Sequence, residues 1–222
     1  MPILCYILVP LVAYLLGSIP FGFLAARARG IDIRTVGSGN IGATNAMRVL
    51  GKPIGIAVLL LDAFKGWFAC VAGAWLCTVL FSSGHAGLAA APDAMPPIER
   101  LRVIAGVFAV LGHNYTCWLK FKGGKGISTT AGVYLALAPW PLLIALVVFL
   151  LAVALTRYIS VGSMAGAVAL PVAVWVMTPH QVLLGVVSTA LGALAIYKHK
   201  SNIQRLRAGT ENRFGRKSGP PK

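Results

Sequence analysis

ILCYILVPLVAYLLGSIPFGFL, residues 3–24, decides the fold class, because no charged side chain interrupts this apolar run. A helix needs about 20 predominantly apolar residues to cross the hydrocarbon core of a bilayer. Similar runs recur along the 222 residues, of which 58% are hydrophobic and only 11% are charged, and the mean hydropathy is +0.80. Because lipid cannot satisfy open backbone groups, such runs cross as helices. The sequence therefore predicts an all-α, polytopic integral membrane protein.

The orientation of the first span follows from the basic residues around it. No Lys or Arg precedes the run, whereas Arg27, Arg29 and Arg34 follow it. A cleaved signal peptide has a basic start and a shorter apolar core, so this run is interpreted as a retained span. Basic residues favour the cytoplasmic side, which predicts an outside N-terminus and cytoplasmic residues 25–53.

The same rule predicts about seven spans within a single membrane-embedded domain, residues 1–222, with a cytoplasmic C-terminus and a basic tail at 198–222. Of the 20 Lys and Arg residues, all but Arg100 and Arg102 are assigned to cytoplasmic ends or loops, with Lys65 counted at the cytoplasmic end of the long second span. The alternative is five full spans plus a re-entrant hairpin at 127–156. The seven predicted spans are residues 3–24, 54–81, 101–118, 127–138, 142–156, 161–177 and 182–197, and Pro139, Trp140 and Pro141 are expected to turn the chain between the fourth and the fifth.

The net charge of +15 lies mostly on the predicted cytoplasmic face. Such a face favours anionic lipid headgroups or anionic substrates. Nucleic acid is a poor partner, because the charges are divided among loops between spans. The four cysteines show no disulfide or metal-ligand spacing and are interpreted as small core residues.

Three polar segments fall on this face, and the first is VGSGNIGATNAMRVLGK, residues 36–52. Glycine permits backbone angles that point consecutive N–H groups one way, and Ser, Thr and Asn cap helices or donate to an oxyanion. Arginine adds a planar fork for phosphate. The competing interpretation is an ordinary interfacial loop with a capped helix. The candidate residues are Ser38, Gly39, Asn40, Thr44, Asn45 and Arg48.

The second segment, KFKGGKG at residues 120–126, suggests backbone N–H groups around a phosphate. It is not a Walker loop, because Ile127 separates Gly126 from Ser128 and no strand is expected before it. A phosphate-binding nest followed by a helix N-terminus, with Ser128 and Thr129 as potential caps, is the simpler prediction. The lysines also fit a role as positive-inside anchors. The candidates are Lys122, Gly123, Gly124, Lys125, Gly126 and Ser128.

The third segment is YKHKSNIQRLRAGTENRFG, residues 197–215. His199 and Asn202 are three residues apart, which places them on one face of a helix extending from the last span. Outside the three segments, Asp62 and Lys65 form an i,i+3 pair in the second span. An ion pair that steadies this span is the first interpretation, and a contribution to the phosphate site is the alternative.

GSGNIGATN, KFKGGKG and HKSN, in this order, resemble the PlsY family over nearly the whole chain, from GSIPFG at residue 17 to NRFG at 215. The resemblance implies a bacterial inner-membrane enzyme with its active site on the cytoplasmic face. It implies acyl transfer from acyl phosphate to glycerol 3-phosphate in phospholipid synthesis, without cofactor, metal or obligatory protein partner. The implied catalytic residues are Ser38, Lys125, His199 and Asn202, the other candidates above bind substrate, and Glu211 has a structural role.

Two questions stay open from the sequence. A transporter of phosphorylated solutes would also explain the cations, although transport requires polar groups at the midplane or paired broken helices. In the acyltransferase, the proton of the acceptor hydroxyl passes either to His199 or to the leaving phosphate. Acyl phosphate is already activated, which slightly favours the phosphate.

Overall fold

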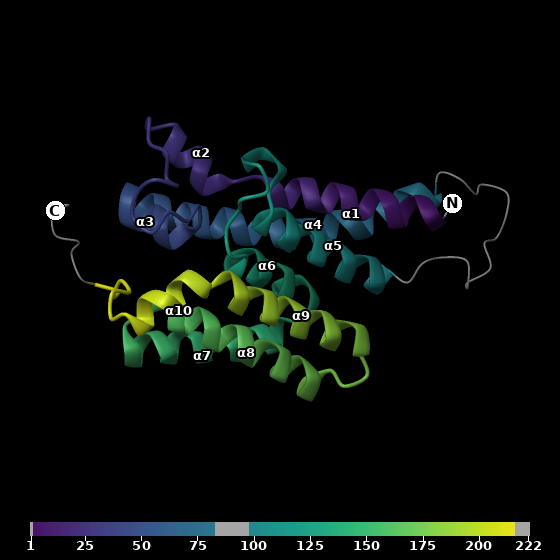
Figure 1. Cartoon of the computed structure of the whole chain (residues 1–222). Helices are drawn as coiled ribbons and strands as arrows, with labels where there is room; N and C mark the ends of the chain where they lie inside the picture. Colours follow the sequence, from purple (N-terminus) through teal and green to yellow (C-terminus); the bar gives the residue numbers. More distant parts are fainter. Residues whose placement is uncertain (1, 83–97, 216–222) are drawn as a thin grey trace. The chain divides into compact units, whose positions relative to one another are not determined.

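The computed structural model describes residues 2–82 and 98–215, and all regular secondary structure in this part of the chain is helical (Figure 1). The predicted outer loop, residues 82–98, lies almost wholly outside the described residues, as does the end of the basic tail. The chain divides into two compact units, Met1–Pro139 and Trp140–Lys222, and each is described by itself. The expectation of one membrane-embedded domain stays a prediction.

The first unit contains three long helices that lie side by side in Figure 1, α1, α4 and α5. Cys5 and Val9 of α1 pack with Ala69 of α4 and with Leu101 and Ala105 of α5. Small residues dominate this core, as expected where helix backbones approach closely in a membrane. The elements are α1 (Pro2–Ser18), α2 (Phe21–Arg27), α3 (Ala43–Leu50), α4 (Lys52–Ser82), α5 (Ile98–Asn114), the 3-10 helix η2 (Cys117–Leu119) and α6 (Ile127–Leu137).

Close approach of the backbones makes two glycines in this unit necessary. A Cβ at Gly112 of α5 would collide with the carbonyl oxygen of Tyr14 in α1. A Cβ at Gly132 of α6 would collide with the carbonyl oxygen of Ala63 in α4. Since main-chain atoms cannot move aside as a flexible side chain can, α1, α4, α5 and α6 form one tightly packed group.

The structure explains why Arg102 lies at the predicted outer end of a span, away from the other basic residues. The Nη2 of Arg102 donates a 2.6 Å hydrogen bond to the carbonyl oxygen of Ala136, in the last turn of α6. The final carbonyls of a helix have no intrahelical donor, and a cation there also complements the helix dipole. Arg102 therefore completes the end of the short helix α6, a role that the distribution of charge along the sequence did not indicate.

The second unit contains α7 (Pro139–Thr156), α8 (Ile159–Met177), α9 (Val182–Lys198) and α10 (Lys200–Arg207). The sequence predicted that Pro139, Trp140 and Pro141 turn the chain; instead they form the first turn of α7. Proline is well tolerated there, because the first N–H groups of a helix have no intrahelical acceptor. Leu155 near the end of α7 is 84% exposed, which is typical of a helix that faces lipid.

The long helices coincide with the seven predicted segments, but the number of full spans stays a prediction. Four stretches of the described residues are long and apolar enough to cross a membrane, and a fifth is obtained if the bent pair α9 and α10 counts as one span. Helices α5 and α6, at 17 and 11 residues, are shorter. The four stretches are Ile3–Arg27, Lys52–Leu76, Pro139–Thr156 and Ile159–Met177.

Candidate active site

The buried amide of Asn45 organises the first polar segment. Its Oδ1 accepts a 2.8 Å hydrogen bond from the N–H of Ser38, and its Nδ2 donates to the carbonyls of Ile33, Val36 and Asn40 at 3.2, 3.1 and 2.9 Å. With only 1% of its surface exposed, Asn45 holds the loop around itself. All of these bonds hold the loop, so the amide of Asn45 has a structural role here, and its contact with substrate stays a prediction.

Two glycines allow this loop to close around Asn45. Gly37 and Gly39 have φ values of 63° and 70°, in the left-handed region that a residue with a Cβ rarely adopts. A Cβ at Gly37 would also collide with Oδ1 of Asn45. The side chain of Asn40 accepts a 2.8 Å bond from the N–H of Gly42, so it too stabilises the turn.

The loop ends at the N-terminus of α3, where Gly42 is the N-cap residue and no described side chain caps the helix. The first N–H groups of a helix lack intrahelical acceptors and carry positive partial charge, which favours an anion. Thr44, in the first turn, is exposed, and Ser38 and Arg48 are half-buried. The structure thus brings Ser38, Thr44 and Arg48 to one short helix and the loop that precedes it.

Asp32, a carboxylate that lies four residues before this segment, is paired with Arg34. Side-chain hydrogen bonds from Arg34, 2.7–3.3 Å long, hold the pKa of the Asp32 carboxyl at about 2. A carboxylate with so low a pKa is a very weak base at neutral pH. Asp32 therefore does not qualify as the proton acceptor.

The glycine segment is fastened to the end of α5 through its own backbone. The N–H of Gly123 donates to the carbonyl of Asn114 at 3.2 Å, and that of Gly124 donates to the carbonyl of His113 at 3.0 Å. Two of the backbone N–H groups that the sequence suggested for phosphate binding therefore hold the loop in place. What these two glycines provide is close approach: a Cβ at Gly123 would collide with the carbonyl oxygen of His113.

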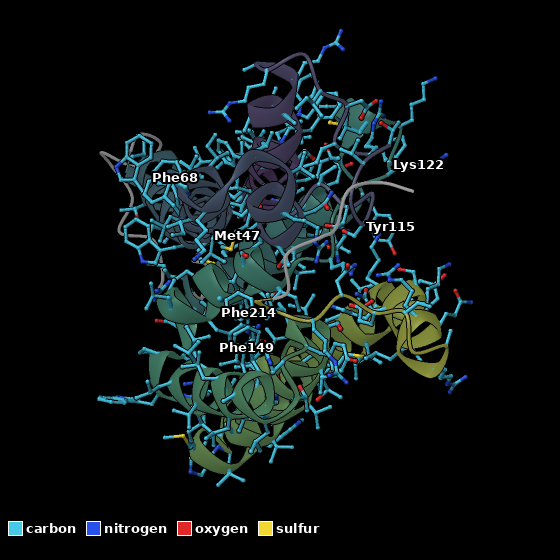
Figure 2. All side chains as sticks on the ribbon, turned by 90° about the vertical axis from the view of Figure 1, so that its left-hand side faces the viewer. Met47, Phe68, Tyr115, Lys122, Phe149 and Phe214 are labelled. Atoms are coloured by element: carbon cyan, nitrogen blue, oxygen red, sulfur yellow. The ribbon has the colours of Figure 1, made fainter. Side chains whose placement is uncertain are left out.

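The first N–H groups of α6, which have no intrahelical acceptors, are the other candidates for holding an anion in this segment. Gly126 is the N-cap residue, with φ of 80°, and no described side chain caps the helix there, so the expected caps Ser128 and Thr129 do not act as such. Lys125 and Ser128 are half-buried beside this terminus. Lys122 is exposed, and its side chain points away from the ribbon in Figure 2. The first unit therefore contains two helix N-termini with glycine caps and adjacent cations.

The turn between α5 and the glycines has an unusual backbone. Lys120 and Phe121 have φ values of 53° and 60°, although neither is glycine. Buried Thr116 stabilises this turn: its carbonyl accepts a 3.0 Å bond from the N–H of Phe121, and its Oγ1 donates to the carbonyl of Ser18 at 2.6 Å. Thr116 was not singled out in the sequence, where a Thr before an apolar turn carries no specific signal.

In the second unit, His199 lies at the junction of α9 and α10, which are inclined by 50°. Its Nδ1 is 2.7 Å from the carbonyl oxygen of Ala195. Because a carbonyl only accepts hydrogen bonds, Nδ1 carries the proton. In a neutral imidazole the other nitrogen, Nε2, is then the acceptor, which suits contact with a hydroxyl group.

Asn202 is tied to the tail by a network around Glu211. Nδ2 of Asn202 and Nε of Arg205 each donate a 2.7 Å bond to the Glu211 carboxylate, one to each oxygen. These two bonds fix the orientation of the Asn202 amide and are consistent with a structural role for Glu211. The pairing of Glu211 with Arg205 was not predicted.

The network makes the tail sensitive to acid. Burial alone would raise the pKa of Glu211, but the hydrogen bonds from Asn202 and Arg205 outweigh it and lower the pKa below its ordinary value. A lowered pKa stabilises the folded tail above the ordinary carboxyl pKa of about 4.3, and this stabilisation is lost as the pH falls through the folded-state value.

We expect amide hydrogen exchange over 200–212, corrected for intrinsic rates, to show strong protection at pH 7 that declines below about pH 4. Glu211→Gln loses charge-assisted bonds worth about 1.5–3 kcal/mol each and should be weakly protected at both pH values. Equal protection of the variant and the parent at pH 7 would contradict this account.

These features define a class: a helical integral membrane protein whose loops present glycine-capped helix N-termini and cations suited to phosphate. The chain belongs to the glycerol-3-phosphate acyltransferase family, whose model matches residues 7–209. A glycerol-3-phosphate acyltransferase of Geobacter sulfurreducens is 46% identical over 203 residues, covering 91% of this chain and 94% of the relative. One of Chlorobaculum parvum is 43% identical over 242 residues, covering 97% and 100%.

Two solved structures of PlsY, an integral membrane glycerol 3-phosphate acyltransferase, share this fold. The glycerol 3-phosphate form has a TM-score of 0.78 and 36% sequence identity, and the match covers 94% of each chain. The lysophosphatidic acid form has a TM-score of 0.75 and 35% identity, with the same coverage. The resemblance inferred from the three motifs is therefore confirmed at the level of the family.

Proposed function

We propose that this chain transfers an acyl group from acyl phosphate to glycerol 3-phosphate, giving 1-acyl-glycerol 3-phosphate and inorganic phosphate, in bacterial phospholipid synthesis. The hydroxyl oxygen of glycerol 3-phosphate attacks the acyl carbonyl carbon, and the bond from that carbon to the bridging phosphate oxygen breaks. The hydroxyl proton passes to the departing phosphate. Acyl phosphate and glycerol 3-phosphate are thus the partners, with membrane lipids around the spans.

The observation that carries this proposal is the pair of glycine-capped helix N-termini, α3 and α6, in the first unit. Both substrates carry a phosphate, so the reaction requires two anion-binding positions. Helix N-termini that lack a side-chain cap supply donors and positive partial charge. Arg48 and Lys125 lie in the same two segments. Relatives named glycerol-3-phosphate acyltransferases support the acceptor.

We assign roles within these segments accordingly. Ser38 and Lys125 contact the reacting groups, because each lies beside one of the two helix N-termini. Gly39, Thr44 and Arg48 bind substrate phosphate at the first segment, and Lys122, Gly126 and Ser128 do so at the second. Asn40, Asn45, Gly123 and Gly124 shape these loops. His199 and Asn202 of the second unit position glycerol 3-phosphate in the same reaction.

A comparison of detergent micelles with sealed vesicles tests the class of function. In detergent, the purified chain should convert acyl phosphate and glycerol 3-phosphate to lysophosphatidic acid, because acyl transfer needs no second compartment. A transporter of phosphorylated solutes would instead move labelled glycerol 3-phosphate into sealed vesicles and form no product in micelles. That second pattern would refute the acyltransferase proposal. We further propose the cytoplasmic membrane as the location, with the active site on its cytoplasmic face.

A further inference from the structure

A buried charged group lies beneath the glycine segment of the first unit. The side chains of Asp62 and Lys65, on α4, and of His113, on α5, are only 3–5% exposed. Lys65 Nζ lies 2.7 Å from Asp62 Oδ1 and donates a 2.8 Å bond to the carbonyl of Ile19, between α1 and α2. Nδ1 of His113 lies 3.5 Å from the same Asp62 oxygen.

The other edge of the His113 ring faces the glycine segment. A Cβ at Gly124 would collide with Nε2 of His113, and its next two neighbours would be carbons of the same ring. The imidazole therefore lies between the Asp62 carboxylate, which faces Nδ1, and the backbone of Gly124, which faces Nε2. The N–H of Gly124 also donates to the carbonyl of His113. Both the ring and the main chain of His113 therefore contact Gly124.

Stability alone is a weak explanation for such a group. Removing two charges from water is costly, and replacing a buried ion pair with apolar residues is often neutral or stabilising. Groups behind a ligand-binding residue commonly act by orienting it, and their removal typically weakens binding by about 10–100-fold. Because the His113 ring contacts Gly124, Asp62, Lys65 and His113 are placed to orient the glycine segment.

We propose that Asp62 and His113 position the glycine segment, residues 120–126, to which we assign the acyl phosphate. Asp62 orients the imidazole through Nδ1, and the imidazole supports Gly124 through its Nε2 edge. Lys65, held by the Ile19 carbonyl, fixes the carboxylate between the two helices. These are positioning residues, because none is assigned a contact with substrate. The proposal rests on the proposed function, since it names the group that places the donor-binding loop.

The orienting role predicts a specific interaction between two substitutions. Gly124→Ala alone should raise the KM for acyl phosphate strongly, because the added methyl group meets a ring that Asp62 holds in place. Asp62→Asn alone should raise this KM by about 10-fold and leave the KM for glycerol 3-phosphate unchanged. In the Asp62→Asn background the ring is free to turn, so the further penalty from Gly124→Ala should be about tenfold smaller than in the parent.

Gly123→Ala is the matched control, because its methyl group would meet the main-chain oxygen of His113, which no turn of the ring can relieve. Its penalty should be the same with Asp62 or Asn at position 62. If Asp62→Asn unfolds the protein, the paired change Asp62→Asn with Lys65→Gln removes both charges and provides the background instead. Thermal unfolding midpoints in detergent separate folding from binding.

The outcomes divide cleanly. A reduced Gly124→Ala penalty together with an unchanged Gly123→Ala penalty supports the positioning role. The proposal is overturned if Gly124→Ala raises the KM for acyl phosphate by the same factor with Asp or Asn at position 62, as Gly123→Ala should. It is also overturned if Asp62→Asn changes the KM for both substrates equally. If the parent chain turns over no acyl phosphate, the proposed function itself fails, which is a result distinct from independent penalties in an active enzyme.

Discussion

Gly123→Ala should lower kcat/KM for acyl phosphate by at least about 100-fold, because a displacement of about 1 Å in a positioning group costs that much. The added Cβ would collide with the carbonyl oxygen of His113, and its next neighbours, Asn114 C and O, lie at 2.8 and 2.9 Å. All of these are main-chain atoms at the end of a packed helix, so the loop and not α5 must move. The hydrogen bond from the N–H of Gly123 to Asn114 would be lost with it.

Gly166→Ala in α8 is the matched control, because the nearest atom to its Cβ, the carbonyl oxygen of Ala145, lies at 3.3 Å. It should change kcat/KM by no more than about twofold. Steady-state kinetics with each substrate varied in turn checks both variants. If Gly123→Ala raises the KM for glycerol 3-phosphate as much as that for acyl phosphate, the assignment of this loop to the donor is wrong.

His199→Gln is the second change with a large expected effect, and it distinguishes two routes for the proton. The Ala195 carbonyl, 2.7 Å from Nδ1, holds the ring so that Nε2 faces outward from that bond. If the leaving phosphate takes the proton, as we propose, glutamine should mainly raise the KM for glycerol 3-phosphate. Any acidic limb of the pH–rate profile should then be retained.

If His199 is instead the general base, kcat should fall by about 10²–10⁴-fold, and an acidic limb near the ordinary histidine pKa of about 6.5 should disappear. His180→Gln, at an exposed position in the turn between α8 and α9, is the matched control, because it also replaces an imidazole but at a residue with no assigned role. A collapse of kcat with the KM for glycerol 3-phosphate unchanged would rule out the route through phosphate.

The helices were predictable from the sequence because each apolar run is long and bounded by glycine, proline or charge. What the runs did not indicate was their packing. Arg102 does not fit the preference of basic residues for the cytoplasmic side, and its contact with the end of α6 explains its position. Pro139 and Pro141 were interpreted as a turn, although proline is also favourable in the first turn of a helix.

The three segments of the candidate site were predictable from the sequence. Which residues shape the loops and which are available to bind substrate was not. The amide of Asn45 is able to donate a hydrogen bond to phosphate, yet its four hydrogen bonds all hold its own loop. The glycines of KFKGGKG were expected to bind phosphate through N–H groups, whereas two of these groups bind α5. Tertiary contacts decide such roles, and the pairing of Asp62 with His113 across two helices has no local signal in the sequence.

The central claim is transfer of the acyl group with release of phosphate, and an isotope experiment tests it most directly. Acyl phosphate labelled with ¹⁸O at the oxygen that bridges carbon and phosphorus is incubated with glycerol 3-phosphate and the purified chain in detergent. Attack on the acyl carbon predicts one phosphate for each lysophosphatidic acid, with all of the bridging label in the phosphate. Label retained in the lipid product, or product formed only when acyl-CoA replaces acyl phosphate, would contradict the account.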